Sequence, residues 1–201
     1  MIIGSISENK KLEKRISITP EIAKKYINLG FQIKLSSNYG KHLGFEEKDY
    51  NEAGVEFVVD EKKLIESVDI VIQMGLLEEN IISLLKPNQF FIGVLNPYEN
   101  KSKLDELVKK KVNLFSLELL PRITRAQSMD ILSSQANLAG YKAVVDSFAY
   151  FQKAIPMMMT AAGTVPAAKV LVVGAGVAGL QAIATAKRMG AIVFATDVRL
   201  A

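Results

Sequence analysis

Three glycines in the last third of the chain have the spacing of a site for a nucleotide phosphate. Gly174, Gly176 and Gly179 follow an apolar, β-branched run, and an alanine-rich stretch of helical character follows them. Gly174 permits a sharp turn, Gly176 lets a pyrophosphate approach the backbone, and Gly179 lets the helix pack close to the strand. The start of that helix offers free N–H groups and the positive end of the helix dipole to an anion.

An aspartate completes this pattern. Asp197 lies 23 residues after Gly174, behind a second apolar run at residues 192–195. A carboxylate about 20 residues beyond the first glycine is typical of a site that accepts a hydrogen bond from a ribose 2′-OH. Because it would repel a 2′-phosphate, it favours NAD over NADP. The alternative is a buried βαβ unit whose glycines serve packing only.

The composition indicates a globular protein with one large or two small domains. The 201 residues are 49% hydrophobic and 23% charged. The net charge of +4 comes from lysines with acidic neighbours, and aromatic residues do not alternate with them, which argues against nucleic-acid binding. With no cysteine and one histidine, His42, we expect neither a metal site nor a Ser-His-Asp triad. No signal peptide and no apolar run of about 20 residues is apparent, so we expect a soluble chain.

Strands and helices alternate through the first 120 residues. Several of the strands are continuous apolar runs, as expected for a parallel sheet that helices cover on both faces. Thr19 and Pro20 have the types that begin a helix. This region lacks the GxGxxG pattern, so we do not expect a second dinucleotide site in it.

A long helical pattern then runs from residue 128 to residue 151. We therefore predict an α/β protein with two doubly wound, parallel-sheet (Rossmann-like) domains joined by a long helix. The predicted parts are an N-terminal domain at 1–125, a linking helix at 126–152, and the start of a nucleotide domain at 153–201. We expect this second domain to be truncated, because a complete one needs further strands. We expect Met157, Met158 and Met159 to be core residues.

A dense group of polar side chains precedes this long helix. Arg122, Arg125, Gln127, Asp130 and Ser133 occur within twelve residues. The simplest interpretation is a helix start, with Asp130 complementing the helix dipole. The functional interpretation is a ligand loop, since ligands of doubly wound domains bind at the carboxyl ends of strands.

The sequence of this loop also resembles a known family. The most specific stretches are PRITRAQSMDILSSQANLAG at 121–140 and MTAAGTVPAAKVLVVGAGVAGLQAIATAKRMGAIVFATDVR at 159–199, with RISITPE at 15–21 in support. They resemble the NAD(H)-binding α subunits of proton-translocating NAD(P) transhydrogenases, whose wider family includes alanine dehydrogenase. The resemblance covers essentially the whole chain.

The resemblance implies roles for individual residues. Gln127, Asp130 and Ser133 would form the catalytic, hydride-transferring end of the site, with Arg122 and Gln127 near the nicotinamide and Asp130 and Ser133 holding its carboxamide. The full set of implied cofactor-binding residues is Arg122, Ile123, Thr124, Arg125, Gln127, Asp130, Ser133, Gly174, Gly176, Val177, Gly179, Asp197, Val198 and Arg199. Within this set the glycines and Val177 would lie under the pyrophosphate, Asp197 on the adenosine ribose, and Val198 and Arg199 beside the adenosine.

The resemblance also implies an activity and partners. Family members pass hydride from NADH to NADP⁺ on a separate domain, coupled to proton translocation by a membrane component. The implied cofactors are NAD(H) here and NADP(H) on the partner. The implied partners are the NADP(H)-binding and membrane-spanning subunits and a second copy in a homodimer. The chain would be cytoplasmic, peripheral on the inner membrane through its partner, and not competent alone.

Two other functions compete with this one. An alanine dehydrogenase would need a lysine and a histidine in the N-terminal domain, where this chain has Gln73 and Asn96 in an ungapped comparison. Neither side chain carries a proton at neutral pH, which favours the transhydrogenase. The third possibility is a module without a competent site, because the nucleotide domain is begun and not finished.

Overall fold

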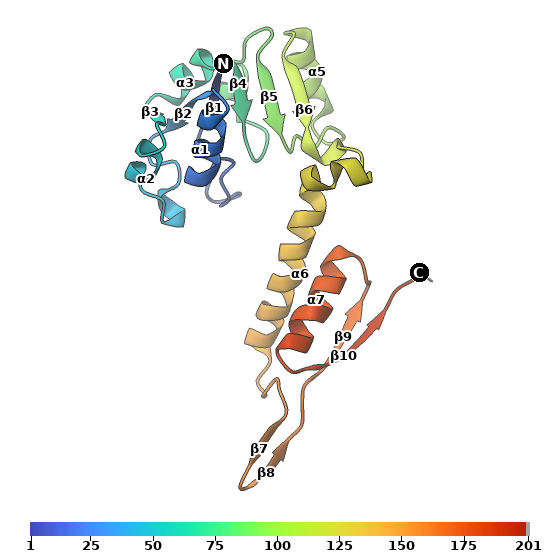
Figure 1. Cartoon of the computed structure of the whole chain (residues 1–201). Coiled ribbons are helices and arrows are strands. Elements are labelled where there is room, and N and C mark those ends of the chain that lie inside the picture. The colour runs from blue at the N-terminus through green and yellow to red at the C-terminus, as the bar shows by residue number, and fades with distance from the viewer. Residues whose placement is uncertain (200–201) are drawn as a thin grey trace. The chain divides into compact units, whose positions relative to one another are not determined.

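The protein is described by a computed structural model that covers residues 1–199. Those residues belong to two compact units, the first of which is Met1–Pro121 and the second of which begins at Arg122 (Figure 1). Each unit is an α/β structure, as the alternation of strands and helices predicts. None of the described helices combines the length and apolar character needed to cross a bilayer.

A six-stranded, fully parallel sheet forms the centre of the first unit. The strands are β1 (Ile2–Ser5), β2 (Gln32–Ser36), β3 (Glu56–Val58), β4 (Ile70–Ile72), β5 (Phe90–Gly93) and β6 (Asn113–Ser116). Their order is β3-β2-β1-β4-β5-β6, which is the order of a doubly wound dinucleotide-binding fold. The winding direction reverses between β1 and β4.

Helices cover both faces of this sheet. They are α1 (Pro20–Asn28), α2 (Glu47–Asn51), α3 (Glu61–Ser67), α4 (Glu79–Ile82) and α5 (Lys101–Lys109), with 3₁₀ turns at Lys41–Leu43 and Leu117–Leu119. The predicted start of α1 is confirmed: the Thr19 side chain accepts a hydrogen bond from the Ile22 N–H, and Pro20 is the first helical residue.

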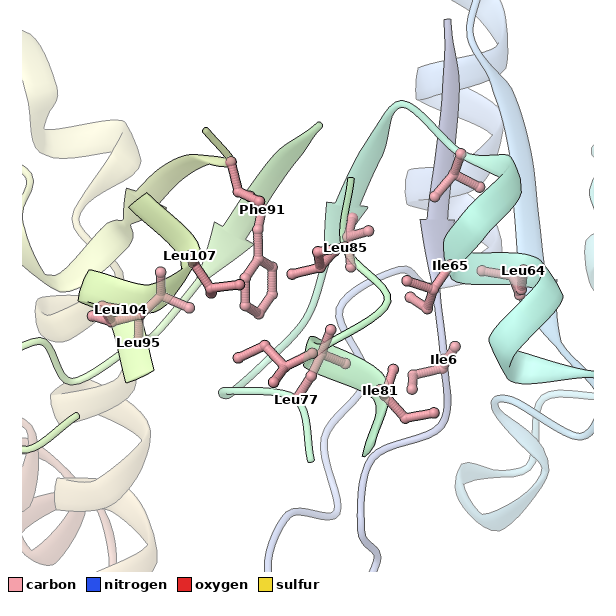
Figure 2. Packing of buried hydrophobic residues seen from close by; sticks show 14 residues of the cluster. Ile6, Leu64, Ile65, Leu77, Ile81, Leu85, Phe91, Leu95, Leu104 and Leu107 are labelled. Atoms are coloured by element: carbon pink, nitrogen blue, oxygen red, sulfur yellow. The ribbon is translucent and has the colours of Figure 1, made fainter. Parts of the chain in front are cut away.

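Two buried clusters reflect the alternation of side chains along the strands. Ile3 of β1 faces α1 and α2, together with Tyr39 and Tyr50. The opposite face packs against α3, α4 and α5 around Phe91 (Figure 2). Because strand side chains alternate between faces, a sheet covered on both sides needs the continuous apolar runs seen in the sequence.

The second unit is built on one βαβ element. Strand β9 (Lys169–Val173), helix α7 (Val177–Arg188) and strand β10 (Ile192–Thr196) follow one another, and the two strands pair in parallel from Lys169↔Ile192 to Val173↔Thr196. The long helix α6 (Ile131–Tyr150) packs against α7 and follows a 3₁₀ helix at Thr124–Met129.

A small hairpin between α6 and β9 differs from expectation. Strands β7 (Met158–Thr160) and β8 (Gly163–Val165) pair antiparallel where the sequence pattern predicts only a connection. Met157, Met158 and Met159 are 59%, 45% and 79% exposed. Their predicted place in the core is therefore wrong, because no described element covers this two-stranded hairpin.

Candidate functional site

The glycine-rich turn joins β9 to α7. Gly174 has φ of +97°, a backbone conformation that residues with a Cβ rarely adopt, so the chain leaves the strand sharply there. Gly176 is the residue that precedes the first turn of α7, and no side chain caps that turn within the described chain. The first N–H groups of α7 therefore lack side-chain acceptors and can donate to an anion.

Gly179 brings the helix close to the turn. A Cβ at this position would collide with the carbonyl group of Gly174 and would also touch Val172. The close approach keeps the start of α7 against the end of β9. This is the packing role that the sequence spacing predicts for the third glycine.

A cavity of about 620 Å³ opens at this turn. It lies within the second unit, between the turn and one face of α6. Six of the predicted site residues line it: Arg122, Ser133, Gly174, Gly176, Val177 and Gly179. Ser133 and Gly174, which are 41 positions apart in the chain, thus face one cavity of a size suited to a small ligand.

The α6 side of this cavity consists of small residues that the sequence patterns did not assign to the site. Ala136, Ala139, Gly140 and Ala143 line it along one face of the helix. A Cβ on Gly140 would collide with the Ala178 carbonyl, so this glycine sets how closely α6 and α7 pack. An isolated glycine inside a helical pattern is the sequence signal that could have revealed this contact.

Asp197 lies directly after β10 and is bonded to the turn. Its Oδ2 accepts a hydrogen bond from the Ala175 N–H at 2.6 Å, and Arg199 donates to both carboxylate oxygens. The Arg199 side chain, its backbone N–H and the Ala175 N–H hold the pKa of Asp197 well below its usual range. The carboxylate is therefore charged and fixed beside the glycine-rich turn.

Asp130 and Ser133 form the N-terminal cap of α6. Asp130 Oδ1 accepts from the Ser133 N–H at 2.9 Å, and Oδ2 accepts from the Ser133 hydroxyl at 2.6 Å. These bonds, with a smaller contribution from the charge of Arg122, lower the pKa of Asp130. The simple interpretation as a helix start is thus present, and it places Ser133 at the cavity.

The remaining predicted residues do not line the cavity. Gln127 lies in the 3₁₀ helix, where its carbonyl accepts from the Asp130 N–H at 3.2 Å. Its side chain is exposed, as are those of Ile123, Thr124, Arg125 and Val198. The structure brings the phosphate turn, Arg122 and Ser133 together, while Gln127 is linked to them only through the cap.

The capping bonds give a direct stability prediction. We expect Asp130→Ala to lower the melting temperature of the second unit by a few degrees, and Asp130→Asn to change it little, because asparagine also caps helices. Because the pKa of Asp130 is lowered in the folded chain, the difference should be present above its ordinary value of 3.8 and disappear as the pH falls below it. Thermal unfolding followed by circular dichroism at pH 7 and pH 3 measures both effects, and equal melting temperatures of the two variants at pH 7 would contradict the capping role.

In the first unit, Gln73 occupies the point where the winding of the sheet reverses. The Gln73 side chain is 4% exposed, and its Oε1 accepts from the Ser5 hydroxyl at 2.7 Å and the Ile6 N–H at 2.9 Å. Its Nε2 donates to Glu8 Oε1 at 3.1 Å, and the Met74 N–H donates to the same oxygen. Burial raises the pKa of Glu8. Both polar atoms of the amide are engaged in holding β1 to β4.

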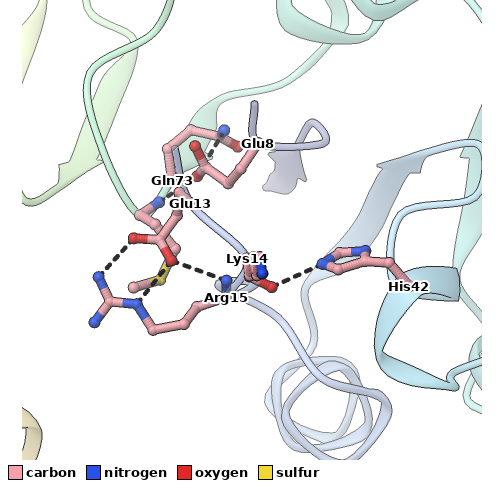
Figure 3. A network of polar contacts seen from close by, with 7 residues as sticks. Glu8, Glu13, Lys14, Arg15, His42 and Gln73 are labelled. Carbon is pink, nitrogen blue, oxygen red and sulfur yellow. Dashed lines mark hydrogen bonds and ion pairs between the residues drawn. The ribbon is translucent and has the colours of Figure 1, made fainter. Parts of the chain in front are cut away.

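The segment after β1 is fixed by further polar contacts (Figure 3). Arg15 pairs with Glu13 at 2.6 Å, and His42 Nε2 lies 2.7 Å from the Lys14 carbonyl oxygen. Asn96 lies away from this network in the left-handed region, with φ of +46°, and its N–H donates to Glu118. Gln73 and Asn96 thus have structural partners and no proton to exchange at neutral pH.

Comparison with known proteins agrees with this architecture. The family model described as "Alanine dehydrogenase/PNT, N-terminal domain" matches residues 4–139, and the model described as "Alanine dehydrogenase/PNT, C-terminal domain" matches residues 143–201. The chain is 44% identical to an NAD(P) transhydrogenase subunit alpha protein of Rhodospirillum rubrum, over 100% of this chain and 54% of that relative. It is 42% identical to the protein of the same name from Rickettsia prowazekii, with the same coverage. The chain thus spans about half the length of these relatives.

Solved structures give the same result. The transhydrogenase from Sinorhizobium meliloti superposes with a TM-score of 0.93 at 42% identity, over 100% of this chain and 60% of that one. An L-alanine dehydrogenase superposes with a TM-score of 0.84 at 22% identity, over 100% of this chain and 55% of that one, which shows a shared fold. With both family models matched and relatives more than 40% identical along its whole length, the chain belongs to the alanine dehydrogenase/PNT family.

Proposed function

We propose that this chain is the NAD(H)-binding component of a transhydrogenase. In this proposal, hydride passes between NADH on this chain and NADP⁺ on a partner domain, and a membrane component couples the transfer to proton translocation. The observation that carries the proposal is the cavity that the glycine-rich turn, Arg122 and Ser133 line together. The relatives named transhydrogenase subunit alpha support the assignment.

The residues around the cavity suit a dinucleotide. The positive φ of Gly174, the absence of a side chain at Gly176 and the uncapped N–H groups of α7 favour a pyrophosphate, and Asp197 beside them favours a ribose hydroxyl. Arg122 and Ser133 at the other side of the cavity would position the nicotinamide end. Bound NADH would supply the hydride, and these side chains would hold the ring and exclude water.

Direct transfer between two nicotinamides needs positioning and no acid or base. The site should then be rich in hydrogen-bonding groups and poor in groups that exchange protons near neutral pH. The loop at 122–133 has this composition. An alanine dehydrogenase, in contrast, needs proton transfer, and Gln73, which stands in place of the expected lysine, is a buried amide engaged by Ser5, Ile6 and Glu8.

The proposal includes the setting in which the chain works. It would act as a homodimer beside NADP(H)-binding and membrane-spanning subunits, at the cytoplasmic face of the inner membrane. Its attachment to the membrane would come from those partners. The family resemblance supports this arrangement.

Nucleotide binding is the decisive test. We expect saturable NADH binding, followed by nicotinamide fluorescence, and NADPH binding weaker by about tenfold or more because Asp197 repels a 2′-phosphate. Adding alanine and NAD⁺ should produce no NADH, whereas adding an NADP(H)-binding partner domain should allow hydride transfer. A folded chain that binds neither nucleotide would refute the proposal, and turnover of alanine would favour the dehydrogenase.

Gln127 provides a test of the positioning role. We expect Gln127→Asn to slow hydride transfer to the partner domain by about tenfold or more, because small misplacements of reacting groups are costly, while NADH affinity changes little. Single-turnover kinetics and NADH titration measure the two quantities. The exposed Asn137→Gln on α6 is the matched control. Equal losses in rate and affinity would count against positioning by Gln127.

A further inference from the structure

Protein donors already occupy the acceptor positions of the Asp197 carboxylate. Oδ1 accepts from the Arg199 backbone N–H at 2.8 Å and from Arg199 Nε at 3.0 Å. Oδ2 accepts from the Ala175 N–H at 2.6 Å and from Arg199 Nη2 at 3.1 Å. A carboxylate offers about four such positions, so a ribose hydroxyl must displace one of these donors.

The guanidinium of Arg199 is the donor that can leave. The two backbone N–H groups are fixed by the turn and by the chain after β10. The Arg199 side chain, in contrast, is 66% exposed, while that of Asp197 is 14% exposed. Exposed ion pairs are weak, and a long side chain can adopt another rotamer. A ribose would therefore displace the Arg199 side chain and keep the backbone bonds.

The displaced group would remain at the mouth of the site. Arg199 Nη2 lies 3.8 Å from the position that a Cβ on Gly176 would take. The guanidinium thus spans from Asp197 to the glycine-rich turn. A phosphate attached to the ribose oxygen that Asp197 binds would lie within reach of this cation.

We infer that Arg199 is a specificity-determining residue: Asp197 masks its guanidinium, and once that carboxylate is removed the same guanidinium binds a phosphate on the adenosine ribose 2′-oxygen. The inference rests on the proposed function, because it assumes that the adenosine of NAD(H) binds at Asp197. It goes further by assigning to this chain a latent site for 2′-phosphorylated nucleotides.

The existing geometry is suited to this second ligand. Nε and Nη2 now donate side by side to the two oxygens of one carboxylate. The same planar pair of donors matches two oxygens of a phosphate, which is why arginine commonly binds this group. Removing Asp197 eliminates both the competitor for the guanidinium and the charge that repels a phosphate.

The test compares NADH and NADPH binding to the full chain and its variants. We expect Asp197→Ala to raise NADPH affinity by about ten- to a hundredfold, the range of a charge-assisted hydrogen bond, and to lower NADH affinity. The Asp197→Ala/Arg199→Met double variant should lose that gain. Arg199→Met alone should keep NADH binding and weaken NADPH binding further, because the charge of Asp197 is then unneutralised.

Two further variants serve as controls. Asp197→Asn retains the size of the side chain and an acceptor for the Ala175 N–H, so it tests the idea if Asp197→Ala unfolds. Arg188→Met removes an equal charge at the far end of α7, about 16 Å from its first residue at 1.5 Å per residue, and should leave the NADPH affinity unchanged. Circular dichroism verifies that each variant is folded.

The possible results separate the two proposals. If the unmodified chain binds NADH but neither Asp197 variant gains NADPH affinity, Arg199 has no such role and the proposed function stands. If the double variant binds NADPH as tightly as Asp197→Ala does, another group binds the phosphate and the inference is wrong. If the folded chain and all variants bind neither nucleotide, the proposed function and this inference both fail.

Discussion

Replacing Gly179 by alanine is expected to abolish NADH binding and to destabilise the second unit. The added Cβ would collide with the Gly174 carbonyl, and its distance to the Gly174 carbonyl carbon would be 2.8 Å. Both are backbone atoms, so rotation of a side chain cannot relieve the contact. The start of α7 must move away from the turn, at a cost of about 1–3 kcal/mol or more. The N–H groups proposed to bind the pyrophosphate would move with it.

Gly176→Ala is the matched control for this substitution. Gly176 has φ of −72°, which alanine adopts without strain, and its added Cβ would have Arg199 Nη2 as its nearest neighbour at 3.8 Å. We expect this variant to keep its stability but to bind NADH more weakly, because the methyl group holds the pyrophosphate away from the backbone. Gly179→Ala should lose both stability and binding.

Calorimetry and NADH titration separate these two effects. Hydrogen exchange of the α7 amides assigns any loss of stability to the second unit. If Gly179→Ala bound NADH as the unmodified chain does, the close contact between helix and turn would have no functional role. If Gly176→Ala also left NADH binding unchanged, the proposed pyrophosphate position would be wrong.

Replacing Gln73 by leucine is expected to destabilise the first unit by about 3 kcal/mol. The leucine can neither accept from the Ser5 hydroxyl and the Ile6 N–H nor donate to Glu8. These groups lie where β1 and β4 meet, and a buried polar group left without a partner costs about 1–3 kcal/mol. The hydroxyl of Ser5 retains Tyr39 and Glu8 retains the Met74 N–H, so the Ile6 N–H accounts for the largest single loss.

Gln32→Leu on β2 provides the control, because Gln32 is exposed and the same chemical change is harmless there. Denaturant unfolding should show a lower midpoint for Gln73→Leu only. NADH affinity under conditions where both units are folded should be unchanged, since the proposed site lies in the second unit. A stable Gln73→Leu chain would show that this network is dispensable, and a stable chain with lost NADH binding would assign Gln73 a functional role.

Much of the candidate site could be predicted from the sequence because its components are local. The glycine spacing, the helix that follows and the aspartate after β10 all lie within one βαβ element of 28 residues, Lys169–Thr196, and the residue just beyond it. Turn geometry and helix capping depend on neighbours a few residues away. The same reason explains why the start of α1 at Thr19 and Pro20 is confirmed.

Other features depend on residues that are distant in the sequence. Gly140 contacts the Ala178 backbone across two helices, and hydropathy does not distinguish this glycine from its alanine neighbours. The hairpin of β7 and β8 and the exposure of its methionines could not be predicted either. An apolar methionine run has the same pattern whether or not another element covers it.

Local signals alone established the order of strands and helices, the glycine-rich turn and the charge that follows it. Periodicity, caps and turn residues act over a few positions, so they can be recognised without a fold. Three-dimensional packing was needed to show that β1 lies beside β4, that α6 lines the cavity at the turn, and that Arg199 occupies Asp197. These are contacts between packed elements or choices among side-chain partners, and they are set by the free energy of the whole folded unit and not by any single segment.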